Sequence, residues 1–164
     1  MSNEASIKPL AVITLVARLA VGGWFLYLGC LKLMGPPADF LKIINEFEVL
    51  PTQPPFLINS VAVFLPVLEV LAGAGMVLGV FLRGSALTVL LSLLAFTPAL
   101  VMRALGIQEA EGLPFCDIAF DCGCGTGEVP ICSKLTENCS LILGAALVLF
   151  SKEQIFTLGK RDSE

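Results

Sequence analysis

Long apolar stretches alternate with short polar ones along this chain. The first, LAVITLVARLAVGGWFLYLGCLKLMG at residues 10–35, is interrupted only by Arg18 and Lys32. A helix needs roughly 20 apolar residues to cross a bilayer, and a signal peptide would have a shorter apolar region with an A-x-A-like cleavage site. We therefore expect a retained membrane span at 10–35.

Three further stretches fit the same template. Residues 55–82 and 84–106 are apolar over a spanning length, and the ten-residue run LILGAALVLF anchors a fourth span at 138–158. The polar residues 107–137 between the last two spans form a cysteine-rich loop. The pattern thus predicts an all-α fold, a four-transmembrane-helix bundle that forms one domain over residues 1–164.

A shorter segment follows the first span. In ADFLKIINEFEVL, residues 38–50, apolar and charged side chains alternate at helical spacing, which is typical of an amphipathic helix. Because it is too short to cross the bilayer, we expect it to lie at the membrane surface.

Composition supports a membrane protein and removes several functions. The 164 residues are 56% hydrophobic and 15% charged, so too little polar surface exists to cover a soluble globule. A net charge of −4 with no basic run argues against nucleic acid as a partner. Since the chain has no histidine, it supplies no imidazole as a metal ligand or general base.

Charge placement predicts the orientation. Four spans put both termini and the turn at Arg83 on one side, and the long loops on the other. The first side carries five basic residues, Lys8, Arg83, Lys152, Lys160 and Arg161, and the second carries four, Lys32, Lys42, Arg103 and Lys134. The basic residues of the first side lie close to the membrane, where they direct topology. We therefore expect cytoplasmic termini in a bacterial inner membrane.

The six cysteines gather at one face in this topology. Cys30 falls near the outer end of the first span, Cys139 at the outer start of the fourth, and the other four in the loop 107–137. The outer face is the compartment where disulfides form and are exchanged. This co-location is the strongest functional signal in the sequence.

Cys122 and Cys124 are candidates for a redox pair. A disulfide across one residue closes a small ring that gains little from loop closure and is readily reduced, and the glycines at 123 and 125 permit the backbone it needs. Cys116 and Cys132 are a plausible second pair, as a brace or as a resolving disulfide. Four cysteines allow three pairings, and the spacing selects none of them.

Other roles for these cysteines compete with redox chemistry. Two purely structural disulfides would staple the loop equally well. A metal site fits less well, because the spacing matches neither zinc knuckles nor ferredoxins. Cys30 and Cys139 are expected to be small buried apolar side chains.

Arg18 and Glu69 are charged residues within predicted spans. An unpaired charge there is costly, so we expect the two to form an ion pair inside the bundle, either to fix helix register or to serve a proton or a quinone headgroup. Pro66 and Pro98 interrupt the hydrogen bonding of their helices. Gly75 and Gly79 form a G-x-x-x-G pattern for close helix contact.

Three segments together resemble the DoxX-like membrane proteins, in particular the MauE branch: ARLAVGGWFLYLGCLKL, PVLEVLAGAGMVLG and DCGCGTGEVP. The resemblance implies a four-helix membrane protein in the maturation of a disulfide-rich periplasmic enzyme, beside a thioredoxin-like partner, with a quinone link in related proteins. The family pattern carries onto Arg18, Glu69, Cys122 and Cys124. Gly125 departs from it, since the family commonly has Phe there, and Cys116 and Cys132 are additions.

Three functions remain open on this basis. The first is a thiol–disulfide electron carrier or disulfide-maturation factor that uses Cys122 and Cys124. The second is a non-catalytic subunit of a larger membrane complex, with the stapled loop as a docking surface. The third is a quinone-interacting subunit that uses the region of Arg18 and Glu69; no other cofactor is expected. The partners expected are the lipid bilayer and a periplasmic thioredoxin-like protein or other subunits.

Overall fold

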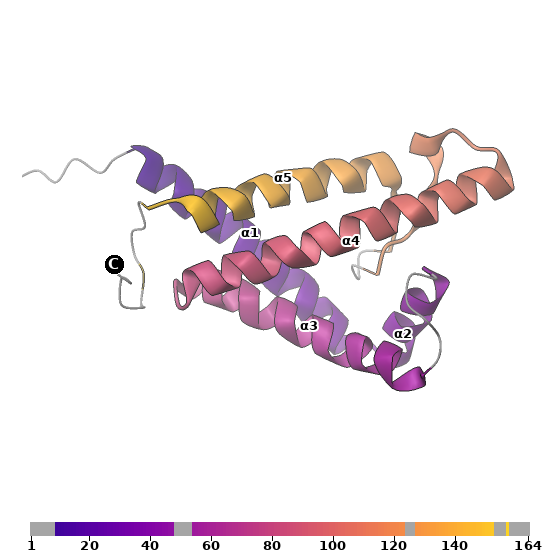
Figure 1. Ribbon diagram of the computed structural model, residues 1–164, viewed down its shortest axis with the longest axis horizontal. Helices are drawn as coiled ribbons and strands as arrows, with labels where there is room; N and C mark the ends of the chain where they lie inside the picture. The colour runs from indigo at the N-terminus through magenta and orange to yellow at the C-terminus, as the bar shows by residue number, and fades with distance from the viewer. Residues whose placement is uncertain (1–8, 48–53, 124–126, 153–156, 158–164) are drawn as a thin grey trace, which may run out of the picture.

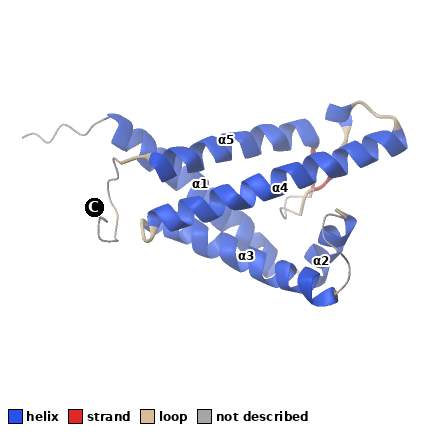
Figure 2. Cartoon of the chain, viewed as in Figure 1, coloured by secondary structure: helices blue, strands red, loops and turns tan. Residues whose placement is uncertain are grey.

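The protein is a helical bundle with a small hairpin at one end. A computed structural model describes residues 9–47, 54–123, 127–152 and 157. The helices are α1 (Pro9–Met34), α2 (Pro37–Glu46), α3 (Pro55–Leu78), α4 (Leu82–Glu111) and α5 (Ile131–Phe150), as Figures 1 and 2 show. Of the described helices, α1, α3, α4 and α5 are long and apolar enough to cross a membrane. The predicted all-α four-span bundle is confirmed, and the chain is a multi-pass membrane protein.

Successive spans run in opposite directions. The start of α1 and the end of α5 lie at one end of the bundle, where the Thr14 hydroxyl donates a hydrogen bond to Ser151 Oγ at 3.2 Å. The turn between α3 and α4 is at the same end (Figure 1). The opposite end carries α2 and the segment between α4 and α5, and we call it the loop end. Which end faces the cytoplasm stays a prediction.

The closest helix contact joins α1 to α3. A Cβ atom added to Gly73 would lie 2.5 Å from the backbone nitrogen of Leu26 and 2.7 Å from the carbonyl oxygen of Gly22. Gly29, two turns further along α1, meets Val70 in the same way. In lipid, helices associate largely through such backbone approaches at small residues. Gly22, Gly29 and Gly73 therefore set the distance between the two helices.

The predicted G-x-x-x-G pattern has a different role. Gly79 lies just beyond α3, where its left-handed backbone (φ 71°) ends the helix. Only Gly75 is inside the helix, and it makes room for the Ser85 side chain. Gly75 thus allows a close contact with Ser85 of α4, and Gly79 ends α3.

The last helix begins earlier than the apolar run suggested. Residue 138 was the expected start of the fourth span, whereas α5 begins at Ile131 after Pro130, and α4 continues to Glu111 instead of ending at 106. The polar side chains Lys134 and Asn138 of the first turns point into the bundle and are buried. The segment outside the helices is therefore shorter than the loop 107–137.

The segment between α4 and α5 also contains regular secondary structure. It contains a 3-10 turn η1 (Phe115–Asp117) and two short antiparallel strands, β1 (Ala119–Asp121) and β2 (Glu128–Pro130). Phe120 pairs with Val129 in the strand register. The backbone N–H of Ile131 donates to the carbonyl of Ile118 at 2.9 Å, which joins the hairpin to the start of α5.

The α1–α3 contact makes a direct prediction. Gly73→Ala forces the two backbones apart and should destabilise the protein by roughly 1–3 kcal/mol. Gly23→Ala is the matched control, because nothing lies within 4 Å of the added Cβ, and it should be neutral or slightly stabilising. Unfolding of both variants in detergent micelles measures the difference. Equal stability of the two variants would contradict the packing described.

Candidate functional site

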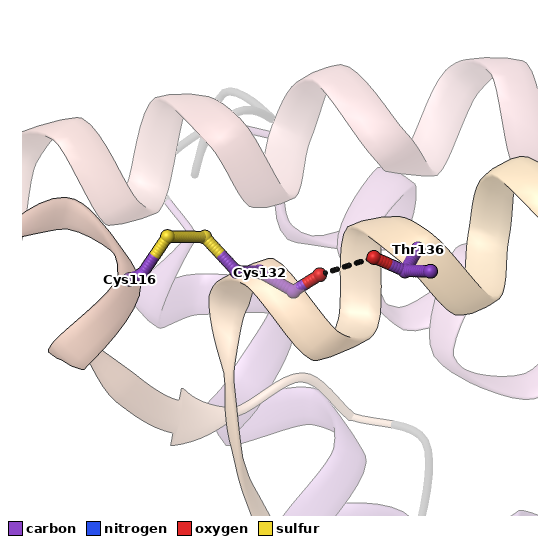
Figure 3. The surroundings of a disulfide bond; sticks show 3 residues. All are labelled: Cys116, Cys132 and Thr136. Carbon is purple, nitrogen blue, oxygen red and sulfur yellow. Dashed lines mark hydrogen bonds between the residues drawn. A yellow bond between two sulfur atoms is a disulfide. The ribbon is translucent and has the colours of Figure 1, made fainter.

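The Cys116–Cys132 disulfide lies on the outside of the loop end. It joins η1 to the first turn of α5 across 16 positions of sequence (Figure 3). Cys116 is exposed and Cys132 is half-buried. The Thr136 hydroxyl donates to the carbonyl oxygen of Cys132 at 2.9 Å, within α5. This is one of the three pairings that the sequence left open, and Cys116 is open to a partner.

Cys122 has the opposite surroundings. It is also disulfide-bonded, but only 1% of it is exposed. It belongs to an apolar cluster with Leu28, Leu100, Ile118 and Ile131. Its sulfur is therefore shielded from solvent, and thiol–disulfide exchange requires access to a sulfur atom. Cys124, its predicted redox partner, lies outside the described residues.

The backbone after Cys122 turns sharply at Gly123. Gly123 has a φ of 72°, which glycine adopts without steric cost. Its N–H donates to the Asp121 carboxylate at 2.9 Å. The predicted need for glycine within the C-x-C segment is therefore confirmed at this position.

Helix α2 covers this turn. A Cβ atom on Gly123 would lie 3.2 Å from Phe40 Cε2 and 3.1 Å from Ile43 Cγ2, so both side chains are in contact with the glycine. Phe47, just after α2, stacks on Phe96 with ring centroids 5.8 Å apart and meets Phe120 edge-on at 6.0 Å. The apolar face of α2 thus rests on the cysteine hairpin.

Glu69 pairs with Lys32 rather than with Arg18. Lys32 Nζ donates to both carboxylate oxygens of Glu69, at 2.7 and 2.8 Å, and their side chains are 6% and 12% exposed. Arg18 lies fourteen residues before Lys32 on α1, about 21 Å along the axis, and is itself buried. The predicted Arg18–Glu69 pair is therefore wrong, because Lys32 is the cation of α1 at the level of Glu69.

A second ion pair lies on α5, with Lys134 buried and the Glu137 side chain 33% exposed. Lys134 Nζ donates to Glu137 at 2.7 Å, and the same carboxylate oxygen accepts a 2.7 Å hydrogen bond from the indole N–H of Trp24 on α1. Asn138, on the next position of α5, donates to the Thr97 hydroxyl of α4 at 3.0 Å. Sequence reasoning missed these contacts because it placed Lys134 and Glu137 in a solvated loop.

Both ion pairs border one small cavity between α1, α3, α4 and α5. Its volume is about 50 Å³, which is enough for a few water molecules but is about a third of a cavity that holds benzene. Leu28 and Phe96 line it and also pack in the cluster around Cys122. The cavity and the cluster around Cys122 therefore share lining side chains. Among the residues that the structure describes, no three Cys, Asp or Glu side chains are placed to hold a metal ion.

Cys30 and Cys139 are free thiols at exposed positions. The expectation that they are buried is wrong, since both lie on outward-facing sides of their helices. Cys139 is eight residues beyond Ile131, about 12 Å into α5, because that helix starts earlier than expected. Cys116, Cys122 and Cys132 of the hairpin lie at the loop end, and Cys30 lies about one turn before the end of α1 on the same side.

Comparison with known proteins gives one match. The family described as "Methylamine utilisation protein MauE" matches residues 10–151, a range that includes all four spans and the cysteine hairpin. No curated protein and no solved structure matches the chain.

The Lys32–Glu69 contact can be tested by a double-mutant cycle. Lys32→Met or Glu69→Leu alone leaves an unpaired charge among apolar side chains and should cost about 3–5 kcal/mol of unfolding free energy. The double variant Lys32→Met/Glu69→Leu should recover most of that loss, because it removes both charges. Additive losses in the cycle, measured by unfolding in micelles, would show that the two residues do not interact.

Proposed function

We propose that the chain, which belongs to the methylamine utilisation protein MauE family, is a membrane-embedded thiol–disulfide exchange protein. Its role is to assist the formation of disulfides in another protein. The observation that carries the proposal is the cysteine hairpin at the loop end. It combines a solvent-exposed disulfide, Cys116–Cys132, with the buried disulfide of Cys122.

The reaction is an exchange between dithiols and disulfides. A target dithiol attacks a hairpin disulfide through a mixed disulfide, gives up two electrons and two protons, and leaves as a disulfide. The hairpin pair is then a dithiol. It returns the two electrons and two protons to the disulfide of a thioredoxin-like partner, which departs reduced. The chain is therefore a relay and needs no bound cofactor for this cycle.

Exposure decides which disulfide the target meets first. Cys116 is open to solvent, whereas Cys122 is enclosed by apolar side chains and by α2. Attack requires access to a sulfur atom. We therefore assign the first contact to Cys116–Cys132, and the onward pair to Cys122 with Cys124 as the sequence predicts. The hairpin then faces the periplasm of a bacterial inner membrane, where such partners reside.

Charge near the hairpin supports a partner-supplied nucleophile. Asp117, Asp121 and Glu128 are exposed around the disulfide, and negative charges disfavour a thiolate on the hairpin itself. The basic residue nearest in sequence, Lys134, is already paired with Glu137. The attacking thiolate of the first step therefore belongs to the target dithiol, and the hairpin acts first as a disulfide.

The quinone alternative is limited by size. The charged cavity beside Glu69 holds about 50 Å³, and a quinone ring is larger than the benzene that needs roughly 150 Å³. A quinone would have to part the helices to reach Lys32 and Glu69. The docking-subunit alternative fits the same hairpin without exchange, and the following experiment separates it from the relay.

The relay predicts transfer from a thioredoxin-fold probe. The oxidised protein in lipid nanodiscs is mixed with a reduced thioredoxin, whose dithiol takes the place of the target dithiol, and hairpin thiols are counted over time by alkylation and mass spectrometry. The wild type should accept electrons, and Cys116→Ser/Cys132→Ser should slow the first transfer by about tenfold or more, because the accessible disulfide is gone.

The matched control is Cys30→Ser/Cys139→Ser, which removes the two exposed free thiols outside the hairpin and should leave transfer unchanged. Wild-type protein that accepts no electrons from the probe would refute the relay and favour the docking subunit. Transfer at the wild-type rate in Cys116→Ser/Cys132→Ser would refute the assignment of the first contact.

A further inference from the structure

A continuous series of contacts runs from the interior of the bundle to Gly123, the residue after Cys122. Glu69 of α3 holds Lys32 of α1 at 2.7 Å. Lys32 Nζ lies 5.2 Å from the centroid of the Phe40 ring of α2. Phe40 in turn contacts Gly123, the residue after Cys122. Four separate segments of the chain are thus joined by three contacts.

Phe40 occupies the central position of this series. It is the buried residue of α2, with 7% of its surface exposed. The ammonium of Lys32 within about 6 Å of the ring is attracted by the negative face of the aromatic system. Because the same ammonium is fixed by two hydrogen bonds to Glu69, the place of the Phe40 ring is determined from inside the bundle.

We infer that Phe40 is a positioning residue for the Cys122 disulfide. The Lys32–Glu69 ion pair sets the position of the Phe40 ring and thereby controls how readily this disulfide is reduced. The inference rests on the proposed function only for the benefit of this control. A relay needs a buried disulfide that resists reduction by unrelated thiols but is accessible to a docked partner. The control itself is a property of the fold.

The physical basis is local opening. Helix α2 has ten residues, too few to be stable without its packing, and short elements with few buried contacts open at a lower free energy than the whole fold. Displacement of α2 from Gly123 uncovers the side of the hairpin that Phe40 and Ile43 cover, and a reductant gains access to the region of Cys122 from there. Loss of the Phe40 ring, or of the ion pair that fixes it, raises the population of that open form.

The experiment compares two disulfides in one molecule. The full chain in nanodiscs is treated with dithiothreitol under native conditions, and the cysteines are alkylated at intervals and mapped by mass spectrometry. The measured quantity is the rate of reduction at Cys122 divided by the rate at Cys116–Cys132. Cys116 is exposed without α2 movement, so it serves as the internal reference.

Phe40→Ala should raise this ratio by about tenfold or more, since it deletes the buried side chain of α2. Phe40→Leu keeps apolar contact but loses the attraction to Lys32, and should give a smaller rise. Glu69→Gln should raise the ratio without any change in α2 itself. The controls are Lys42→Ala, on the exposed face of α2, and Glu109→Gln, at the exposed end of α4, and both should leave the ratio unchanged.

An unchanged ratio in Phe40→Ala and Glu69→Gln would overturn the inference. So would an equal rise at both disulfides, which means that the fold as a whole has loosened. Failure of the proposed function appears elsewhere, as a wild type that accepts no electrons from thioredoxin. The ratio can respond to Phe40 in that case too, so the two failures are distinguishable.

Discussion

The loop end depends on one constraint, that a charge inside an apolar bundle must have a partner. Lys32 and Glu69 satisfy it for each other between α1 and α3, with two hydrogen bonds and almost no exposure. Lys134 and Glu137 do the same on α5, and Trp24 joins them to α1. Neither pair can be separated without stranding a charge, so the register of α1 against α3 and α5 is fixed at the level where the cysteine hairpin begins.

The hairpin inherits its geometry from that fixed end. Ile131, at the start of α5, is hydrogen-bonded to Ile118, and the Cys116–Cys132 disulfide closes the same junction. Phe40 lies on the hairpin from one side and next to Lys32 on the other. A membrane bundle with little mass outside the bilayer thus carries an exposed disulfide and a covered one on a rigid base. That arrangement suits a small exchange protein, in which the partner supplies both the thiolate and the specificity.

Apolar run length was sufficient to predict the four spans, because the requirement to cross a bilayer acts on each segment alone. Amphipathic spacing predicted the short helix after the first span, which the structure has at Pro37–Glu46. The Cys116–Cys132 pair was foreseen as one of the possible pairings. The partner of Glu69 was not, because depth in the membrane depends on where each helix starts and how it tilts, and a run of apolar residues does not record this. The start of α5 was missed for a related reason. Lys134 and Asn138 are polar and were expected in solvent, but both are buried in the bundle, and Asn138 is hydrogen-bonded to α4. Cys30 and Cys139 show the converse, since a thiol reads equally well as a buried or an outward-facing residue of a membrane helix.

A redox titration of the hairpin tests the exchange role most directly. The protein in nanodiscs is equilibrated at potentials between about −120 and −320 mV, and each cysteine is mapped by differential alkylation. We predict that Cys116–Cys132 and the Cys122 disulfide are reduced reversibly with midpoint potentials more positive than about −270 mV, within the range of thioredoxin-fold carriers. If both disulfides remain oxidised at about −300 mV, as structural disulfides do, the hairpin disulfides are purely structural and the exchange role is wrong.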